Sequence, residues 1–230
     1  MVAVELTIWL SIKVALAAVG LNLVPGLFFG WLLARKQFRG KMLLDTLINL
    51  PLVMPPVVTG YFLLILFGRR GVFGKWLFEH TGLALSFTWQ AAALAAAVVA
   101  LPLYVRSVRV AIESVDPRIE EAARVLRASP WKTFWKVTLP LSRHGILAGL
   151  VLAFARSLGE FGATIMVAGN IPGETQTIPL AIFSLVNRPG GERQAAVLII
   201  VSIVLAYLSL IVSEWLLRRW KANTVEGAIG

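Results

Sequence analysis

The sequence predicts an all-α polytopic membrane protein that crosses the bilayer about five times. Of its 230 residues, 58% are hydrophobic and only 15% are charged, and the mean hydropathy is +0.79. Several apolar runs exceed the roughly 18 residues that a membrane-spanning helix needs. Basic residues gather between these runs, as they do in the cytoplasmic loops of membrane proteins. Together these observations exclude an ordinary water-soluble domain.

Five apolar segments are long enough to cross a hydrocarbon core about 30 Å thick. We expect spans at residues 6–34, 43–68, 87–105, 145–168 and 195–217, within a single domain over residues 1–230. The first segment lacks a basic region before it and is too long for a signal peptide, so we interpret it as a retained span. The second contains Pro51, Pro55 and Pro56, which should bend or interrupt it.

The distribution of Lys and Arg predicts the orientation. Segments 35–41, 106–143 and 218–221 carry four, eight and three basic residues, fifteen of the 22 in all, and five spans place them on one side. Five others lie on the opposite side and two within spans. The N-terminus is therefore expected outside and the C-terminus in the cytoplasm of a prokaryotic plasma (inner) membrane. Topology accounts for the formal charge of +10, so we expect no nucleic-acid partner.

The side chains that carry most enzyme chemistry are scarce. The chain has no cysteine, and its two histidines, His80 and His144, lie far apart. It also lacks the Gly-x-x-x-x-Gly-Lys-Ser/Thr loop that cradles nucleotide phosphates. We therefore expect no catalytic residue, no metal site and no cofactor in this chain.

A charged and aromatic segment interrupts the apolar chain between the third and fourth spans. Asp116-Pro117 and Ser129-Pro130 are both typical helix starts, a capping side chain followed by proline. Apolar residues then recur at helical spacing in each half, which predicts two short amphipathic helices over residues 117–138. We expect their aromatic face to be buried against the ends of the spans. From periodicity alone, a pair of helices lying on the lipid headgroups is an equally good interpretation.

The order of residues in this segment resembles a known signature. "EAARVLRASPWKTFWKVTLP" is similar to the EAA signature of permease subunits of type I ABC importers, which begins Glu-Ala-Ala and ends in Leu-Pro. Glu121, Ala122 and Ala123 match in place, and the signature's glycine, six residues after the glutamate, falls at Arg127. The resemblance implies that the two helices dock into a cytoplasmic ATPase, which binds ATP and Mg²⁺. The residues it implies for this coupling are Glu120, Glu121, Ala122, Ala123, Arg127, Ala128 and Ser129.

Other stretches resemble one branch of that family, the molybdate (or tungstate) permeases of bacteria. These are "LPLVMPPVVTGY", "GRRGVFG", "RSLGEFGAT" and "IPGETQTIPLAIF". The resemblance implies a homodimer that forms the route for the oxyanion, an ATPase pair, and an extracytoplasmic molybdate-binding protein. Sulfate permeases share part of these motifs and remain the alternative. An ion-coupled secondary transporter fits less well, because no internal repeat is visible and intramembrane charges are few.

Several residues outside the signature are candidates for the transport route or for docking. Arg156 and Glu160 lie four apart in the fourth span, so they form either a structural ion pair or part of a gate. Pro55 and Pro56 predict either a cavity-lining break or a simple kink. Three residues of the outer loops are candidates for contact with a binding protein: Arg69, Arg70 and Glu174. The two arginines could instead be solvated or offer positive potential to an oxyanion outside, and a turn is an equally good interpretation of residues 170–173, just before Glu174.

Overall fold

The computed structural model describes residues 2–226, with side chains described for residues 4–218, and that part of the chain is helical with no strand. Four long helices dominate it: α1 (Val2–Arg35), α5 (Trp89–Glu113), α8 (Leu139–Leu158) and α11 (Glu192–Glu226). Each is long and apolar enough to cross a membrane, α8 together with the residues before it from Pro130. The expected all-α fold is confirmed.

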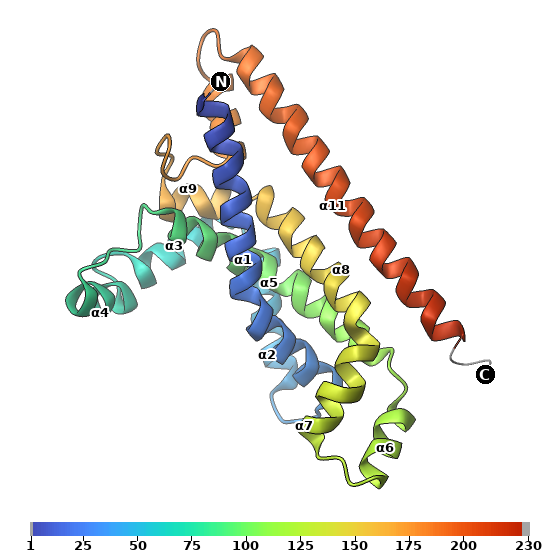
Figure 1. Cartoon of the computed structure of the whole chain (residues 1–230). Helices are drawn as coiled ribbons and strands as arrows, with labels where there is room; N and C mark the ends of the chain where they lie inside the picture. Colours follow the sequence, from blue (N-terminus) through green and yellow to red (C-terminus); the bar gives the residue numbers. More distant parts are fainter. Residues whose placement is uncertain (1, 227–230) are drawn as a thin grey trace.

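Shorter helices connect these four. They are α2 (Lys41–Val53), α3 (Pro56–Phe67), α4 (Val72–Thr81), α6 (Pro117–Val125), α7 (Pro130–Thr133), the π-helical turn η1 (Phe134–Thr138), α9 (Gly162–Ala168) and α10 (Ile178–Val186). The helix α4 projects sideways from the body, and α6 and α7 form one end of the molecule (Figure 1). The start of α1 and the turn before α11 lie at the opposite end (Figure 1).

The second expected span is two helices rather than one. The axes of α2 and α3 differ in direction by 112°. The break falls at Met54 and Pro55, which are both extended, and Pro56 then starts α3. Because the proline ring clashes with a continuing helix, the two adjacent prolines end one helix and begin the next. Among the described residues, the chain thus has four helices that are each long and apolar enough to span a membrane, or five such spans if this bent pair counts as one.

The fourth expected span is also interrupted. The helix α8 ends at Leu158, and the backbone leaves the helical conformation through Gly159, Glu160 and Phe161 before α9 begins. The expectation of a continuous helix over 145–168 is therefore wrong. The third span is longer than expected, because α5 continues past Val105 to Glu113 and carries Arg106 and Arg109 within it.

The helix α5 lies at the centre of the packing. About two thirds of the most apolar 18-residue stretch of α5 is buried, compared with 17% of the corresponding stretch of α11. Its first half is rich in alanine, and the buried set includes Ala92, Ala96 and Ala100. Small side chains let helices approach closely, which is how helices associate in a bilayer. The core therefore lies along α5, and α11 lies at its edge with most of its apolar surface exposed.

Candidate coupling element and membrane-internal breaks

The first helix of the candidate coupling element, α6, begins as its sequence predicts. The carboxylate of Asp116 accepts a hydrogen bond from the backbone N–H of Arg118 (2.9 Å), and Pro117 occupies the first helical position. Such a cap satisfies a backbone donor that the helix itself leaves free. The start of α6 is thus determined locally by two adjacent residues.

The end of α6 explains why a glycine is expected at Arg127. Arg127 has φ of 59°, in the left-handed region that residues with a Cβ seldom adopt. The backbone N–H of Ala128 donates to the carbonyl of Ala123 (3.1 Å), and that of Arg127 donates to Arg124 (2.9 Å). These two bonds are the Schellman ending of a helix, whose left-handed residue is usually glycine. The corner between the helices therefore keeps its geometry although an arginine occupies it.

The second helix of the candidate coupling element continues past residue 138 and through Pro140. Ser129 caps it by accepting a hydrogen bond from the N–H of Lys132 (3.3 Å), and α7 then runs through η1 directly into α8. Pro140 has no N–H and its ring crowds the carbonyl four residues earlier, which a wider π-helical turn accommodates. This helix is consequently continuous with a membrane-spanning helix, without an intervening loop.

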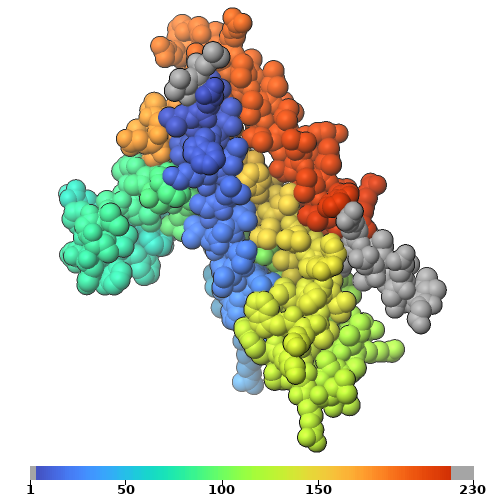
Figure 2. Space-filling model, viewed as in Figure 1, coloured from blue at the N-terminus to red at the C-terminus, as the bar shows by residue number. Residues whose placement is uncertain are grey.

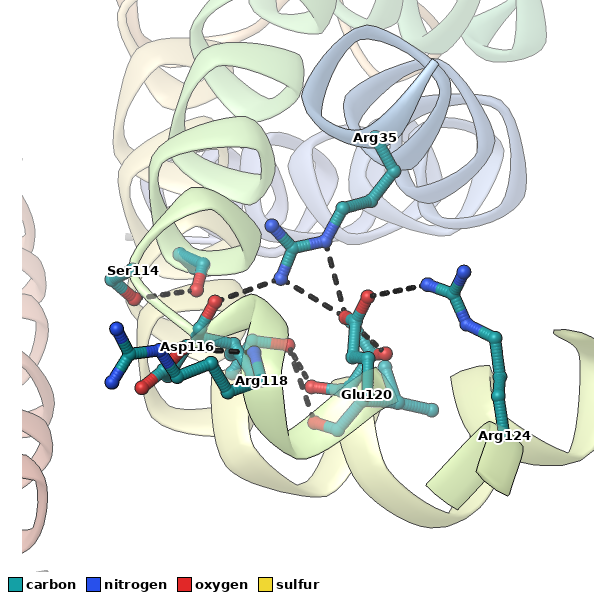
Figure 3. Close-up of polar contacts among 11 residues, drawn as sticks. Arg35, Ser114, Asp116, Arg118, Glu120 and Arg124 are labelled. Carbon is teal, nitrogen blue, oxygen red and sulfur yellow. Dashed lines mark hydrogen bonds and ion pairs between the residues drawn. The ribbon is translucent and has the colours of Figure 1, made fainter. Parts of the chain in front are cut away.

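Glu120 is the buried anchor of the element (Figure 3). Its Oε1 is 3.0 Å from the guanidinium of Arg35 at the end of α1, and it accepts a hydrogen bond from the hydroxyl of Thr138 (2.7 Å). The same guanidinium donates to the carbonyl of Val115 (2.9 Å). Its other oxygen is 3.8 Å from Arg124. One carboxylate therefore joins α6 to α1 and to the end of η1, directly before α8.

The remaining predicted coupling residues form the surface of the element. Glu121, Ala122, Arg127 and Ser129 are exposed, and Ala123 and Ala128 are half-buried. Glu121 and the small alanine beside it are thus free to meet another protein. The two adjacent glutamates differ completely, since Glu120 faces inward and only Glu121 faces out.

The aromatic face is less buried than expected. Trp131 is 71% exposed and Trp135 is 47% exposed, so the expectation that this face is covered by the chain's own helices is wrong for both. Phe134 alone packs inward, edge-on to Trp31 of α1 with ring centroids 5.9 Å apart. The two indoles pack instead against each other and against Phe134.

The two breaks within the membrane-spanning part lie against each other. A Cβ at Gly162, the first residue of α9, would lie 2.9 Å from Pro56 Cβ, and a Cβ at Gly60 would lie 2.6 Å from the carbonyl oxygen of Ala163. The first turns of α3 and α9 therefore cross almost backbone to backbone. The structure thus places Pro56 next to the segment that contains Glu160.

Arg156 and Glu160 form an ion pair across the second break. The guanidinium of Arg156 is 2.8 Å from Oε2 of Glu160, while Oε1 accepts a hydrogen bond from the N–H of Ala163 (2.9 Å). The side chain of Glu160 is 2% exposed and that of Arg156 is 32% exposed. Glu160 therefore caps α9 and ties it to α8. Two hydroxyls near these breaks in the chain, those of Thr59 and Ser157, are buried without a hydrogen-bond partner.

The outer-loop candidates do not form one cluster. Arg69 lies over the ring of Phe78 (4.3 Å to its centroid), and both line an open pocket of about 490 Å³ with Arg70 and Lys75 beside α4. Glu174 is exposed in the turn that precedes α10. Within the described side chains, no hydrogen bond or ion pair joins either arginine to Glu174.

Most of the chain matches one known protein family. A family model described as "Binding-protein-dependent transport system inner membrane component" matches residues 26–222. The chain belongs to this family. It is accordingly a multi-pass protein of the inner membrane and a component of a transport system, with ATP hydrolysis left to a partner ATPase.

Relatives within this transport family are close in sequence. The molybdenum transport system permease protein ModB of Escherichia coli (strain K12) is 56% identical over 209 residues, which cover 91% of each chain. ModB of Haemophilus influenzae is 51% identical over 220 residues, 96% of each chain. The sulfate transport system permease protein CysW of Escherichia coli (strain K12) is 40% identical over 92% of this chain and 73% of its own length.

Solved structures of ABC transporters share the fold of this family member. A chain of the inward-facing MetNI methionine ABC transporter superposes with a TM-score of 0.71 at 18% identity, covering 93% of this chain and 94% of that one. An amino acid ABC transporter solved with histidines gives a TM-score of 0.61 at 20% identity, with 96% and 94% covered. At these identities the likeness concerns the fold alone.

Two groups of polar residues in this transport component are not predicted by the sequence. Arg35 counts as an ordinary loop cation by its position, yet it binds Glu120, 85 residues away. Arg109 similarly joins Asp45 of α2 (2.9 Å) and Glu113 of α5 (2.8 Å). Only the i, i+4 spacing of Arg109 and Glu113 is visible in the sequence. Among the described residues, no group of three or more His, Asp or Glu is placed to hold a metal ion.

Proposed function

We propose that this chain is the membrane-spanning permease subunit of an ATP-driven importer of molybdate (or tungstate). Two copies form the transport route, a pair of cytoplasmic ATPases drives it, and an extracytoplasmic binding protein delivers the oxyanion. The N-terminus lies outside and the C-terminus in the cytoplasm. The observation that carries the proposal is the 56% identity to a molybdenum permease over 91% of both chains.

The choice of molybdate over sulfate rests on the difference between these relatives. The identity to the sulfate permease is 40%, and the match covers only 73% of that longer chain. A route that must release its substrate should bind it weakly, so we assign selectivity to the binding protein. Sulfate therefore remains the alternative that a transport experiment must exclude.

Coupling to the ATPase is assigned to the exposed face of α6 and its corner. Glu121 and Ala122 are exposed there, where a charged group and a small contact suit docking. ATP binding brings the two ATPases together and moves both coupling elements, which opens the route outward, and hydrolysis resets it inward. Glu120 carries this movement to α1 through Arg35, and η1 carries it into α8.

The membrane-internal breaks are assigned to the gate of the route. Pro55 and Pro56 form the break between α2 and α3, while the ion pair of Arg156 and Glu160 spans the break between α8 and α9. Ionisable residues at membrane depth usually face the bundle interior or a water-filled path. Arg69 and Arg70 beside α4, and Glu174 before α10, are the residues we assign to docking of the binding protein.

The substrate is tested with the purified transporter in lipid vesicles. The binding protein is loaded separately with molybdate, tungstate or sulfate, and the rate of ATP hydrolysis is measured. We expect stimulation by the molybdate-loaded and tungstate-loaded forms only. Stimulation by sulfate and not by molybdate would overturn the choice of substrate while leaving the ATPase-coupled permease intact.

The coupling assignment is tested by association with the ATPase. Glu121→Ala combined with Ala122→Trp should abolish co-purification of the ATPase and ATP-driven uptake, because both changes lie on the exposed docking face. Lys75→Gln, an exposed change on α4, is the matched control for docking of the ATPase and should leave co-purification of the ATPase unaffected. Survival of both properties in the double variant would show that this face does not dock the ATPase.

A further inference from the structure

An apolar groove separates the C-terminal half of α1 from the start of the second coupling helix. It has a volume of about 490 Å³ and is lined by apolar and aromatic residues, among them Val24, Phe28, Trp31, Trp131 and Trp135. Val24 and Trp131 are each 71% exposed. Figure 2 shows the lower part of α1 (blue) beside the yellow segment that forms the other wall. Nothing within the described chain fills this space.

The groove continues into a smaller, positively charged pocket. The two share Trp31, Pro130 and Phe134. The second pocket, of about 170 Å³, is lined also by Arg35, Lys36 and Arg124, with Glu120 as the one carboxylate in its lining. Arg35 pairs with Glu120 at 3.0 Å, and Arg124 lies 3.8 Å from the other oxygen of the same carboxylate. The ammonium of Lys36 contacts only the Trp31 ring (5.7 Å to its centroid) among the described residues. An apolar slot thus leads to a site with an excess of positive charge.

The depth of the groove indicates what can occupy it. Val24 lies eleven residues before Arg35 at the end of α1, which corresponds to about 16 Å along the helix. A water-soluble ATPase cannot reach so far into a membrane span, whereas a lipid chain lies there naturally. Tryptophans such as Trp131 and Trp135 gather at the level of the lipid headgroups, and long basic side chains extend to the same level.

We propose that this groove binds an anionic phospholipid. One acyl chain lies between α1 and the coupling helix, and the phosphate lies beside Lys36 and Arg124. The lipid thereby fills the gap between a span and the element that moves it. The inference rests on the proposed function for the role of that element, but the binding site itself depends only on the groove and its basic end.

The test measures lipid retained by the purified transporter with its ATPase. Native mass spectrometry compares phosphatidylglycerol with phosphatidylcholine, without oxyanion or ATP. We expect phosphatidylglycerol to be preferred and the preference to fall about fivefold in Lys36→Gln and in Arg124→Gln, since each basic residue near an anionic surface contributes about 1 kcal/mol. Val24→Trp should reduce retention of both lipids because the indole fills the slot.

Two matched controls distinguish lipid binding in this groove from non-specific attraction to positive charge and from binding of a small anion without an acyl chain. Lys75→Gln removes an exposed cation on α4 and should keep the wild-type preference. Glycerol 3-phosphate should fail to displace phosphatidylglycerol, because it lacks the acyl chain. Equal retention of the two lipids by the wild type, an equal loss in Lys75→Gln, or displacement by glycerol 3-phosphate would each overturn the proposal. None of these results bears on oxyanion-stimulated ATP hydrolysis, which tests the proposed function separately.

Discussion

At the scale of single residues, Arg127 shows how a family motif tolerates a departure. Its left-handed backbone (φ of 59°) completes the Schellman ending of α6. The cost of placing a side chain there is about 1–2 kcal/mol. The corner survives because the two hydrogen bonds that close it use only backbone atoms.

Arg127→Gly should therefore stabilise the corner. A gain of about 1 kcal/mol corresponds to roughly fivefold slower hydrogen exchange at the Ala128 amide. Arg118→Gly also removes an arginine, but from a right-handed helical position of α6. Because glycine destabilises a helix there, this variant should speed hydrogen exchange at the Ala128 amide instead. Faster exchange in both variants would show that the left-handed geometry at Arg127 is not the source of the cost.

The ion pair of Arg35 and Glu120 is the other decisive contact at this scale. Their side chains are only 16% and 7% exposed, so removal of one leaves a largely buried charge unpaired. Arg35→Gln and Glu120→Gln should each lower the free energy of unfolding by up to about 3–5 kcal/mol.

The double variant tests whether the two charges act as a pair. Arg35→Gln with Glu120→Gln should cost less than the sum of the single changes, because no unpaired charge remains. Thermal unfolding of the purified chain in detergent measures all three. Strict additivity would contradict a direct interaction.

At the scale of elements, the crossing of α3 and α9 holds the two helix breaks together. Gly60 allows it, because a Cβ there would meet the carbonyl oxygen and Cα of Ala163 at 2.6 and 2.7 Å. Both are backbone atoms and cannot rotate away. The gate assigned to this region thus depends on a contact that admits no side chain.

Gly60→Ala should consequently destabilise the protein by about 1–3 kcal/mol, the usual cost of overpacking. Gly20→Ala in α1 is the matched control, because nothing lies within 4 Å of a Cβ at that position. The control should be neutral or stabilising by up to about 1 kcal/mol. The melting temperatures of the two variants measure the difference, and an equal loss in both would refute the close crossing.

At the scale of the whole molecule, the two ends differ in charge and in form. The loop before α2 and the α6–α7 element lie at one end, and the start of α1 lies at the other (Figure 1). This arrangement agrees with a cytoplasmic coupling end and an outward N-terminus. The orientation itself stays a prediction that rests on the distribution of Lys and Arg.

The absence of cysteine makes the orientation directly testable. Lys75→Cys on α4 should react with a membrane-impermeant maleimide added to right-side-out vesicles. Lys132→Cys in the coupling element should react only after the membrane is permeabilised. The reverse pattern would invert the proposed topology and with it the side on which the ATPase docks.

The sequence alone determined the features that depend on local order. Apolar run length predicted a helical membrane protein, and capping residues such as Asp116 and Ser129 predicted both helix starts in the coupling element. The order of residues within the motifs also indicated the transport family. Each of these features depends on residues that are close together in the sequence.

Only the tertiary structure decided which residues meet. Both Glu120 and Glu121 were expected to take part in coupling, yet one binds Arg35 from 85 residues away and the other is exposed. The break after Leu158 was also not predicted, because residues such as Gly159 and Phe161 occur in continuous membrane helices. The break becomes visible only in the structure, where the carboxylate of Glu160 caps the start of α9. The burial of Glu120 and the position of this break depend on packing between distant segments. The spacing of residues along one sequence does not show which distant segments pack together.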